Sequence, residues 1–232
     1  MIVKLDKSII PACDINSLEK LKQLVKETSS VEGIGAYKIG LELVIPFGLK
    51  KVLEVIKKIT DLPIIYDYQK AATDIPELGE KFAKACKEVD AVILFPQAGP
   101  VTEEAWIKAA LKEKIKVIVG GEMTHKGYLE SDNGFIKNDA PKRIYEIAAK
   151  LGIKDFVVPG NKPEKIKEYR EFLESLGITP IFYSPGLVAQ GGKITESAKM
   201  AGPYWHAIVG RAIYNAKDMN KAAKEMTKEL IL

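Results

Sequence analysis

The sequence predicts a (β/α)8 barrel, in which eight short parallel strands are each followed by a helix. Short apolar runs alternate with amphipathic stretches along the whole chain, which is the pattern of βα units and a parallel sheet. Eight such pairs can be counted, and eight is the number that closes a barrel. The length of 232 residues suits one barrel domain spanning 1–232.

Each predicted strand is a short apolar run bounded by polar or turn residues. The strands cover residues 9–13, 36–41, 63–67, 91–95, 116–120, 156–158, 180–183 and 205–209. An open doubly wound sheet is the structural alternative, but it usually has fewer units and a glycine-rich turn after its first strand. Here that turn reads Cys13-Asp14-Ile15-Asn16 and contains no glycine, so we favour the barrel.

The predicted helices show amphipathic spacing, and several begin at an N-cap residue or an early proline. They cover residues 17–27, 46–59, 76–87, 103–112, 141–151, 163–176, 195–200 and 218–230. The longest irregular connection, 123–138, follows the fifth strand. Active sites of such barrels lie at the C-terminal ends of the strands, where this connection begins.

The composition excludes several functional classes. Hydrophobic residues make up 47% and charged residues 28% of the chain, as in soluble globular proteins. The net charge of +4 is too small and diffuse to indicate nucleic-acid binding, although it favours an anionic metabolite. The cysteines, Cys13 and Cys86, show no metal-type spacing, and no apolar run is long enough to span a membrane. We therefore expect a cytoplasmic protein with no obligatory metal, no membrane and no nucleic-acid partner.

Two glycine-containing loops, 184–192 and 209–213, predict a phosphate site after the seventh and eighth strands. Glycine lets backbone N–H groups approach an anion closely, and a helix start favours negative charge. Phosphate sites in barrels frequently lie at this position. The candidate residues are Pro185, Gln190, Gly210 and Arg211, and the arginine fork suits phosphate oxygens. The predicted ligand is a small phosphorylated metabolite.

A second candidate group consists of Lys38, Asp67, Lys70 and Asp74, after the second and third strands. Alternating lysines and carboxylates at one mouth hold each other ionised, and a lysine placed there can deliver a proton. From spacing alone, a solvated cluster at a helix start is an equally good interpretation.

The run 209–216, with 184–192 before it, resembles the phosphate-binding segments of the orotidine 5'-monophosphate (OMP) decarboxylases. The segments 37–40, 73–76 and 121–125 are similar to further signature positions of that family, and the agreement runs in order from Asp14 to Arg211. The resemblance implies a cofactor-free decarboxylation of OMP to uridine monophosphate (UMP), a step of pyrimidine biosynthesis, in a homodimer.

The resemblance also implies catalytic roles. Asp67 would press its charge against the substrate carboxylate, and Lys70 would protonate the ring carbanion that remains when carbon dioxide leaves. Lys38 and Asp74 would complete the charge array, with Asp74 reaching into the site of the other subunit. Because a ring carbanion is very basic, such an enzyme depends on preorganised charges and on binding the distant phosphate.

The implied binding roles belong to residues at other strand ends. Asp14 would bind ribose hydroxyls, and Thr124 would contact the pyrimidine amide. Gln190 and Arg211 would hold the phosphate.

The sequence departs from the family pattern at two places. The family spacing is Asp-x-Lys-x-x-Asp, whereas Asp67, Lys70 and Asp74 are each one residue further apart. Since strand side chains alternate, residues three apart do not share a face. Either a bulge restores the alignment, which we favour, or Gln69 takes the place of the lysine and activity is lost. Leu78 stands where a ribose-binding threonine is expected, which predicts a weaker contact to a sugar hydroxyl.

Two other functions remain open at this point. A Mg²⁺-dependent aldolase similar to the hexulose-phosphate synthases would keep the barrel and the phosphate site. A non-catalytic nucleotide-binding barrel would bind UMP or OMP and leave it unchanged.

Overall fold

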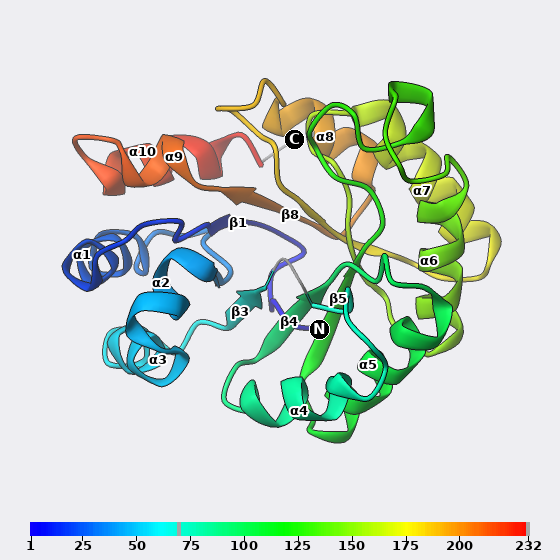
Figure 1. The fold of residues 1–232 in the computed structure, drawn as a ribbon. Helices are drawn as coiled ribbons and strands as arrows, with labels where there is room; N and C mark the ends of the chain where they lie inside the picture. Colours follow the sequence, from blue (N-terminus) through cyan, green and yellow to red (C-terminus); the bar gives the residue numbers. More distant parts are fainter. Residues whose placement is uncertain (69–70, 231–232) are drawn as a thin grey trace.

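The computed structural model describes residues 1–68 and 71–230, and within them eight parallel strands form a barrel (Figure 1). The strands are β1 (Lys7–Pro11), β2 (Tyr37–Ile39), β3 (Ile64–Asp67), β4 (Ala91–Leu94), β5 (Lys116–Gly120), β6 (Asp155–Val157), β7 (Ile181–Ser184) and β8 (Trp205–Val209). Their order is β1-β8-β7-β6-β5-β4-β3-β2. Parallel bridges from Ile9 to Ile34 and from Ala12 to Lys38 join β1 to β2 and close the circle. The predicted barrel is confirmed.

Helices surround the strands (Figure 1). They are α1 (Leu18–Thr28), α2 (Leu41–Phe47), α3 (Leu49–Lys57), α4 (Leu78–Ala85), α5 (Pro100–Lys112), α6 (Ala140–Lys150), α7 (Pro163–Ser175), α8 (Ile194–Ala201), α9 (Arg211–Tyr214) and α10 (Met219–Lys228). A 3-10 turn, η1 (Glu130–Asp132), interrupts the long connection after β5. No helix in the described part of the chain is both long and apolar enough to cross a membrane.

The connection after β2 differs from the prediction. Proline was expected to start a helix at position 46, but α2 begins at Leu41 and contains Pro46 near its end. Gly48, with φ of 79°, then interrupts the helical backbone between α2 and α3. A positive φ is accessible to glycine at little cost, so the predicted helix 46–59 is divided there. The predicted strand 36–41 is correspondingly shorter, because Leu41 already belongs to α2.

Successive side chains of each strand point alternately into the barrel and out toward the helices, which produces two apolar layers. Side chains such as Ile10, Ile65, Ile118 and Ile181 face one another inside the barrel and pack with Ile2 and Val3, which precede β1. Their strand neighbours, including Ile9, Tyr37 and Phe156, pack against the helices. The N-terminal segment fills the end of the barrel at which the strands begin. The opposite end, at which the strands finish, is therefore the one open to polar residues.

A polar pair lies within the barrel interior. The Nδ1 atom of His206 on β8 is 2.8 Å from the Oγ atom of Ser8 on β1, and both residues are buried. The Tyr183 ring packs against the imidazole, with 4.8 Å between centroids. Burial lowers the pKa of His206 from 6.5 to about 3 because the charged ring would lose its hydration. The imidazole is therefore neutral in the folded protein at ordinary pH.

This burial predicts a specific pH dependence of stability. The unfolded chain takes up a proton at His206 below about pH 6.5, whereas the folded protein does so only near pH 3. Acidification therefore favours the unfolded state, and His206 should reduce the free energy of unfolding by about 2 kcal/mol between pH 8 and pH 5. Urea titrations across this range measure the slope. His206→Gln should flatten it, and His125→Gln, at the exposed second histidine, should not. Equal slopes for wild type and His206→Gln would contradict the prediction.

Candidate active site

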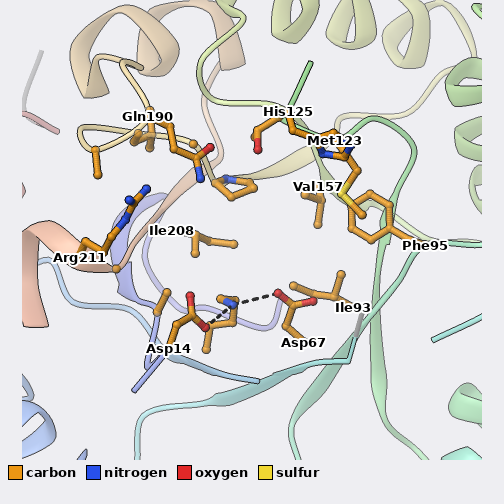
Figure 2. Close-up of a pocket in the computed structure, with 18 of the residues that line it drawn as sticks. Asp14, Asp67, Ile93, Phe95, Met123, His125, Val157, Gln190, Ile208 and Arg211 are labelled. Carbon is orange, nitrogen blue, oxygen red and sulfur yellow. Dashed lines mark hydrogen bonds and ion pairs between the residues drawn. The ribbon is translucent and has the colours of Figure 1, made fainter. Parts of the chain in front are cut away.

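A cavity of about 400 Å³ opens at the C-terminal ends of the strands (Figure 2). Its floor is apolar and is formed by the inward side chains Ile93, Val157 and Ile208, from β4, the end of β6 and β8. Polar residues from the loops after the strands stand around this floor. A ligand in this cavity would rest its apolar part on the floor and direct its polar groups to the walls.

One wall carries a buried ammonium between two carboxylates. The Nζ atom of Lys38 lies 2.9 Å from Oδ2 of Asp67 and 3.1 Å from Oδ1 of Asp14. Lys38 and Asp67 are each only 8% exposed, whereas Asp14 is more accessible. Figure 2 shows the two aspartates on either side of the ammonium. Together the three groups carry a net negative charge.

Strand geometry explains why these groups meet. Tyr37 and Ile39 pack outward against the helices, so Lys38 between them points inward. Lys38 pairs with Ile65 on β3, and Asp67, two residues further along, projects from the same face. Asp14 follows β1, whose end is tied to β2 by the N–H of Cys13 donating to the carbonyl of Lys38 at 2.8 Å.

The electrostatics keep Lys38 charged. Burial alone would lower the pKa of its ammonium, but the ion pairs with Asp67 and Asp14 outweigh burial and hold the pKa above its ordinary value. Lys38 is therefore a fixed positive charge and a poor proton donor. In this position it keeps two carboxylates directed into the cavity.

A second wall is built by the loops after β7 and β8. Gly186 and Gly191 both adopt φ of 90°, and the N–H of Val188 donates to the carbonyl of Gly192 at 2.7 Å, which folds the first loop back on itself. Gln190 comes from this loop and Arg211 begins α9; Figure 2 shows both on the same side of the cavity. A cationic guanidinium fork and an amide beside a helix start are suited to phosphate oxygens.

The third wall is the segment 123–125, which follows β5. Met123, Thr124 and His125 line the cavity, and Thr124 lies close to the Gly186 backbone. The His125 ring meets the Tyr128 ring edge-on, with 5.7 Å between centroids. The loop after β5 thus approaches the loop that carries Gln190.

The structure brings together most of the site residues predicted from the sequence. Within the described part of the chain, the cavity is lined by the predicted residues Asp14, Lys38, Asp67, Thr124, Pro185, Gln190, Gly210 and Arg211. Asp74 is exposed and lies outside the cavity, where its carboxylate accepts a hydrogen bond from the N–H of Ile75 at 2.7 Å. Lys70 and Gln69 lie outside the described residues, so the choice between a bulge and a displaced lysine stays a prediction.

Sequence reasoning missed Tyr214, which also lines the cavity. It lies three residues after Arg211, so both project from one side of the single turn of α9. That short helix was not predicted. The one sequence feature that could have indicated Tyr214 is its spacing of three residues from Arg211, which places both on one side of a helical turn. Among residues 1–68 and 71–230, no group of three or more His, Cys, Asp or Glu side chains is placed to hold a metal ion.

Comparisons with known proteins agree with this architecture. The model of the orotidine 5'-phosphate decarboxylase / HUMPS family matches residues 7–226. The orotidine 5'-phosphate decarboxylase of Methanocaldococcus jannaschii is 33% identical over 221 residues, which cover 95% of this chain and 96% of that protein. The Pyrococcus furiosus decarboxylase is 34% identical over 224 residues, covering 96% and 97%.

Solved structures give the same result. The crystal structure of the M. jannaschii decarboxylase complexed with the inhibitor BMP superposes with a TM-score of 0.85 at 30% identity, covering 97% of this chain and 99% of that one. The Pyrococcus horikoshii decarboxylase gives 0.78 at 29% identity, covering 96% and 98%. The barrel, the residues gathered at its mouth and a match over nearly the whole chain lead to one conclusion: this chain belongs to the orotidine 5'-phosphate decarboxylase / HUMPS family.

Proposed function

We propose that this protein decarboxylates OMP to UMP. The observation that carries the proposal is a single cavity with the Asp14–Lys38–Asp67 cluster on one wall and Gln190 with Arg211 on another. Its volume of about 400 Å³ suits a ligand the size of a nucleotide. An anion-binding end and a fixed charge cluster are what a phosphorylated substrate with a reacting carboxylate requires.

The proposed chemistry needs no redox step. Asp67 would face the substrate carboxylate, and loss of carbon dioxide would relieve their repulsion. The carbon–carbon bond breaks, and its electron pair remains on the ring carbon. A lysine ammonium then transfers a proton to that carbon. We assign this transfer to Lys70, because the two strong ion pairs of Lys38 hold its proton. Electrostatic preorganisation of this kind is a large source of rate enhancement.

Remote binding energy would support the reaction. Gln190 and Arg211 would hold the phosphate, assisted by backbone groups at Pro185 and Gly210, while Asp14 would bind the ribose and Thr124 the pyrimidine amide. Contacts to the nonreacting phosphate fix the ring against Asp67 and supply binding energy for that crowded arrangement.

We further propose that the protein is a homodimer with shared active sites. Ile75, directly after Asp74, is 56% exposed, and Val101, directly before Thr102 on α5, is 70% exposed. The carbonyl of Asp74 accepts a hydrogen bond from Thr102 on α5 at 3.0 Å, so the Asp74 loop and α5 form one surface. Exposed apolar residues grouped in this way favour self-association. Leu78 packs against the core, so it offers nothing to a ribose across the interface.

We place the enzyme in the cytoplasm, with residues 1–232 acting as one domain. The curated relatives at 33% and 34% identity are decarboxylases, which favours this function over the Mg²⁺-dependent aldolase and over a non-catalytic nucleotide-binding barrel.

The purified protein should convert OMP to UMP in the presence of EDTA, and Lys70→Ala should abolish turnover. Loss of the proton donor leaves the carbanion without a partner. The measurement is the loss of orotate absorbance. Lys167→Ala, at an exposed position on α7, serves as the matched control and should retain full activity. Dependence on Mg²⁺, or wild-type rates in Lys70→Ala, would contradict the assignment.

Arg211→Ala should lower kcat/KM for OMP roughly a hundredfold, because a charged, bidentate contact to phosphate is lost. Steady-state kinetics measure this change, and Arg170→Ala on α7 is the matched control. Added guanidinium, which replaces the lost cation, should restore part of the activity only in Arg211→Ala. An Arg211→Ala enzyme with unchanged kinetics would place the phosphate elsewhere.

Shared sites predict complementation between inactive variants. Lys70→Ala and Asp74→Ala should each be inactive alone. A mixed dimer of the two contains one site with both residues intact, so an equal mixture that exchanges subunits should recover roughly a quarter of wild-type activity. Activity is followed after unfolding and refolding the variants together. Recovery no greater than the sum of the separate variants would show that Asp74 does not act across subunits.

A further inference from the structure

A buried polar cluster lies directly behind the wall that carries Thr124. Glu122 follows β5 by two residues and is only 1% exposed. Its Oε1 atom is 2.7 Å from the ammonium of Lys162, and its Oε2 atom accepts a hydrogen bond from the hydroxyl of Tyr169 on α7. Neither Glu122 nor Tyr169 lines the active-site cavity. Burying a carboxylate costs free energy unless it is paired. The two partners of Glu122 supply that pairing, and the place of the cluster behind the cavity wall suggests that it supports the wall.

Two further tyrosines hold the backbone directly before Glu122. The Tyr145 hydroxyl accepts a hydrogen bond from the N–H of Gly121 at 3.2 Å and donates to the carbonyl of Val157 at 2.8 Å. The Tyr128 hydroxyl donates to the carbonyl of Gly121 at 3.1 Å. The Tyr145 and Tyr169 rings meet edge-on, with 5.1 Å between centroids.

The next residues are tied in the same way. The Lys162 ammonium approaches the carbonyl of Met123 at 3.5 Å, and the Nδ2 atom of Asn161 donates to the carbonyl of Thr124 at 3.1 Å. The segment 121–124 is therefore attached to α6, α7 and the loop after β6 by successive contacts. Met123 and Thr124, whose carbonyls are held in this way, and His125, which follows them, line the cavity.

Tyr169 remains a donor under ordinary conditions. Burial, the neighbouring Tyr145 and the hydrogen bond to Glu122 all raise the pKa of its phenol above the ordinary value. The contact to Glu122 is thus a phenol donating to a carboxylate. Charge-assisted hydrogen bonds of this kind are stronger than neutral ones.

We propose that Glu122 and Tyr169 are positioning residues that hold Thr124 at the base-binding wall and so set the affinity for the base of the nucleotide, independently of its phosphate. The inference rests on the proposed function, because it takes the ligand to be a pyrimidine nucleotide. The phosphate end is built by Gln190 and Arg211 from other loops, so the two contributions can be separated by experiment.

The test compares UMP with ribose 5-phosphate, which lacks the base, by titration calorimetry. Tyr169→Phe keeps the ring and removes the hydroxyl. It should weaken UMP binding about tenfold, as expected for one charge-assisted hydrogen bond, and change ribose 5-phosphate binding less than about twofold. For OMP, KM should rise about tenfold while kcat changes less than about threefold, since the charge cluster on the opposite wall is untouched.

Tyr183→Phe is the matched control. It removes another buried phenol that donates to a carboxylate, at 2.9 Å to Asp155, but Asp155 begins β6 at the end of the barrel opposite the cavity. Its affinities for both ligands should stay at wild-type values. If Tyr169→Phe does not fold, Glu122→Gln, which keeps the side-chain size and removes the ion pair, should show the same selective loss for UMP.

The outcomes are distinguishable. Wild-type protein that neither binds UMP nor consumes OMP would overturn the proposed function and this inference with it. Wild-type protein that does both, with a Tyr169→Phe variant that binds UMP normally or loses both ligands equally, would overturn the positioning role alone.

Discussion

The ion pairs of Lys38 with Asp14 and Asp67 are the interaction on which the mouth of the barrel depends. A buried ammonium without partners would cost several kcal/mol, so it requires both carboxylates to be in place. That requirement links the ends of β1, β2 and β3, which come from different βα units. The pair between Lys38 and Asp14 also crosses from β1 to β2, where the bridge between Ala12 and Lys38 closes the barrel, so this pair forms only when the circle is complete.

The same constraint organises the cavity. The charge cluster occupies the side of the cavity made by the first three βα units. Gln190 and Arg211, the residues suited to bind phosphate, occupy the side made by the last two. An apolar floor of Ile93, Val157 and Ile208 separates them from the packed interior and excludes water from below. In the proposed function, a substrate would be held at one end and exposed to fixed charges at the other, an arrangement that converts remote binding energy into rate.

The third wall follows a different physical logic. Its residues project from an irregular segment, and irregular backbone is not held by a strand ladder. Side-chain contacts from Tyr145, Tyr128, Lys162 and Asn161 replace that ladder. Buried tyrosines are suited to this task because their rings fill the space between strand and helix while the hydroxyl reaches a backbone group. Side-chain hydrogen bonds therefore support this wall where the strand ladder ends.

The sequence by itself determined the barrel, because apolar periodicity and strand–helix alternation are local properties that survive without knowledge of contacts. It also predicted that the loops containing Gln190 and Arg211 lie together at the mouth, since their glycines and Arg211 stand directly after the last two strands; their binding of phosphate stays a prediction. Only the tertiary structure decided which groups meet. Lys38 bonds to residues 24 and 29 positions away, and Glu122 bonds to Tyr169, 47 positions away; no local pattern specifies such pairings. Pro46 was misleading for a related reason, because proline fits either the start or the interior of a short helix until the break at Gly48 is known. The spacing around Lys70 is the point at which strand alternation alone leaves two geometries open.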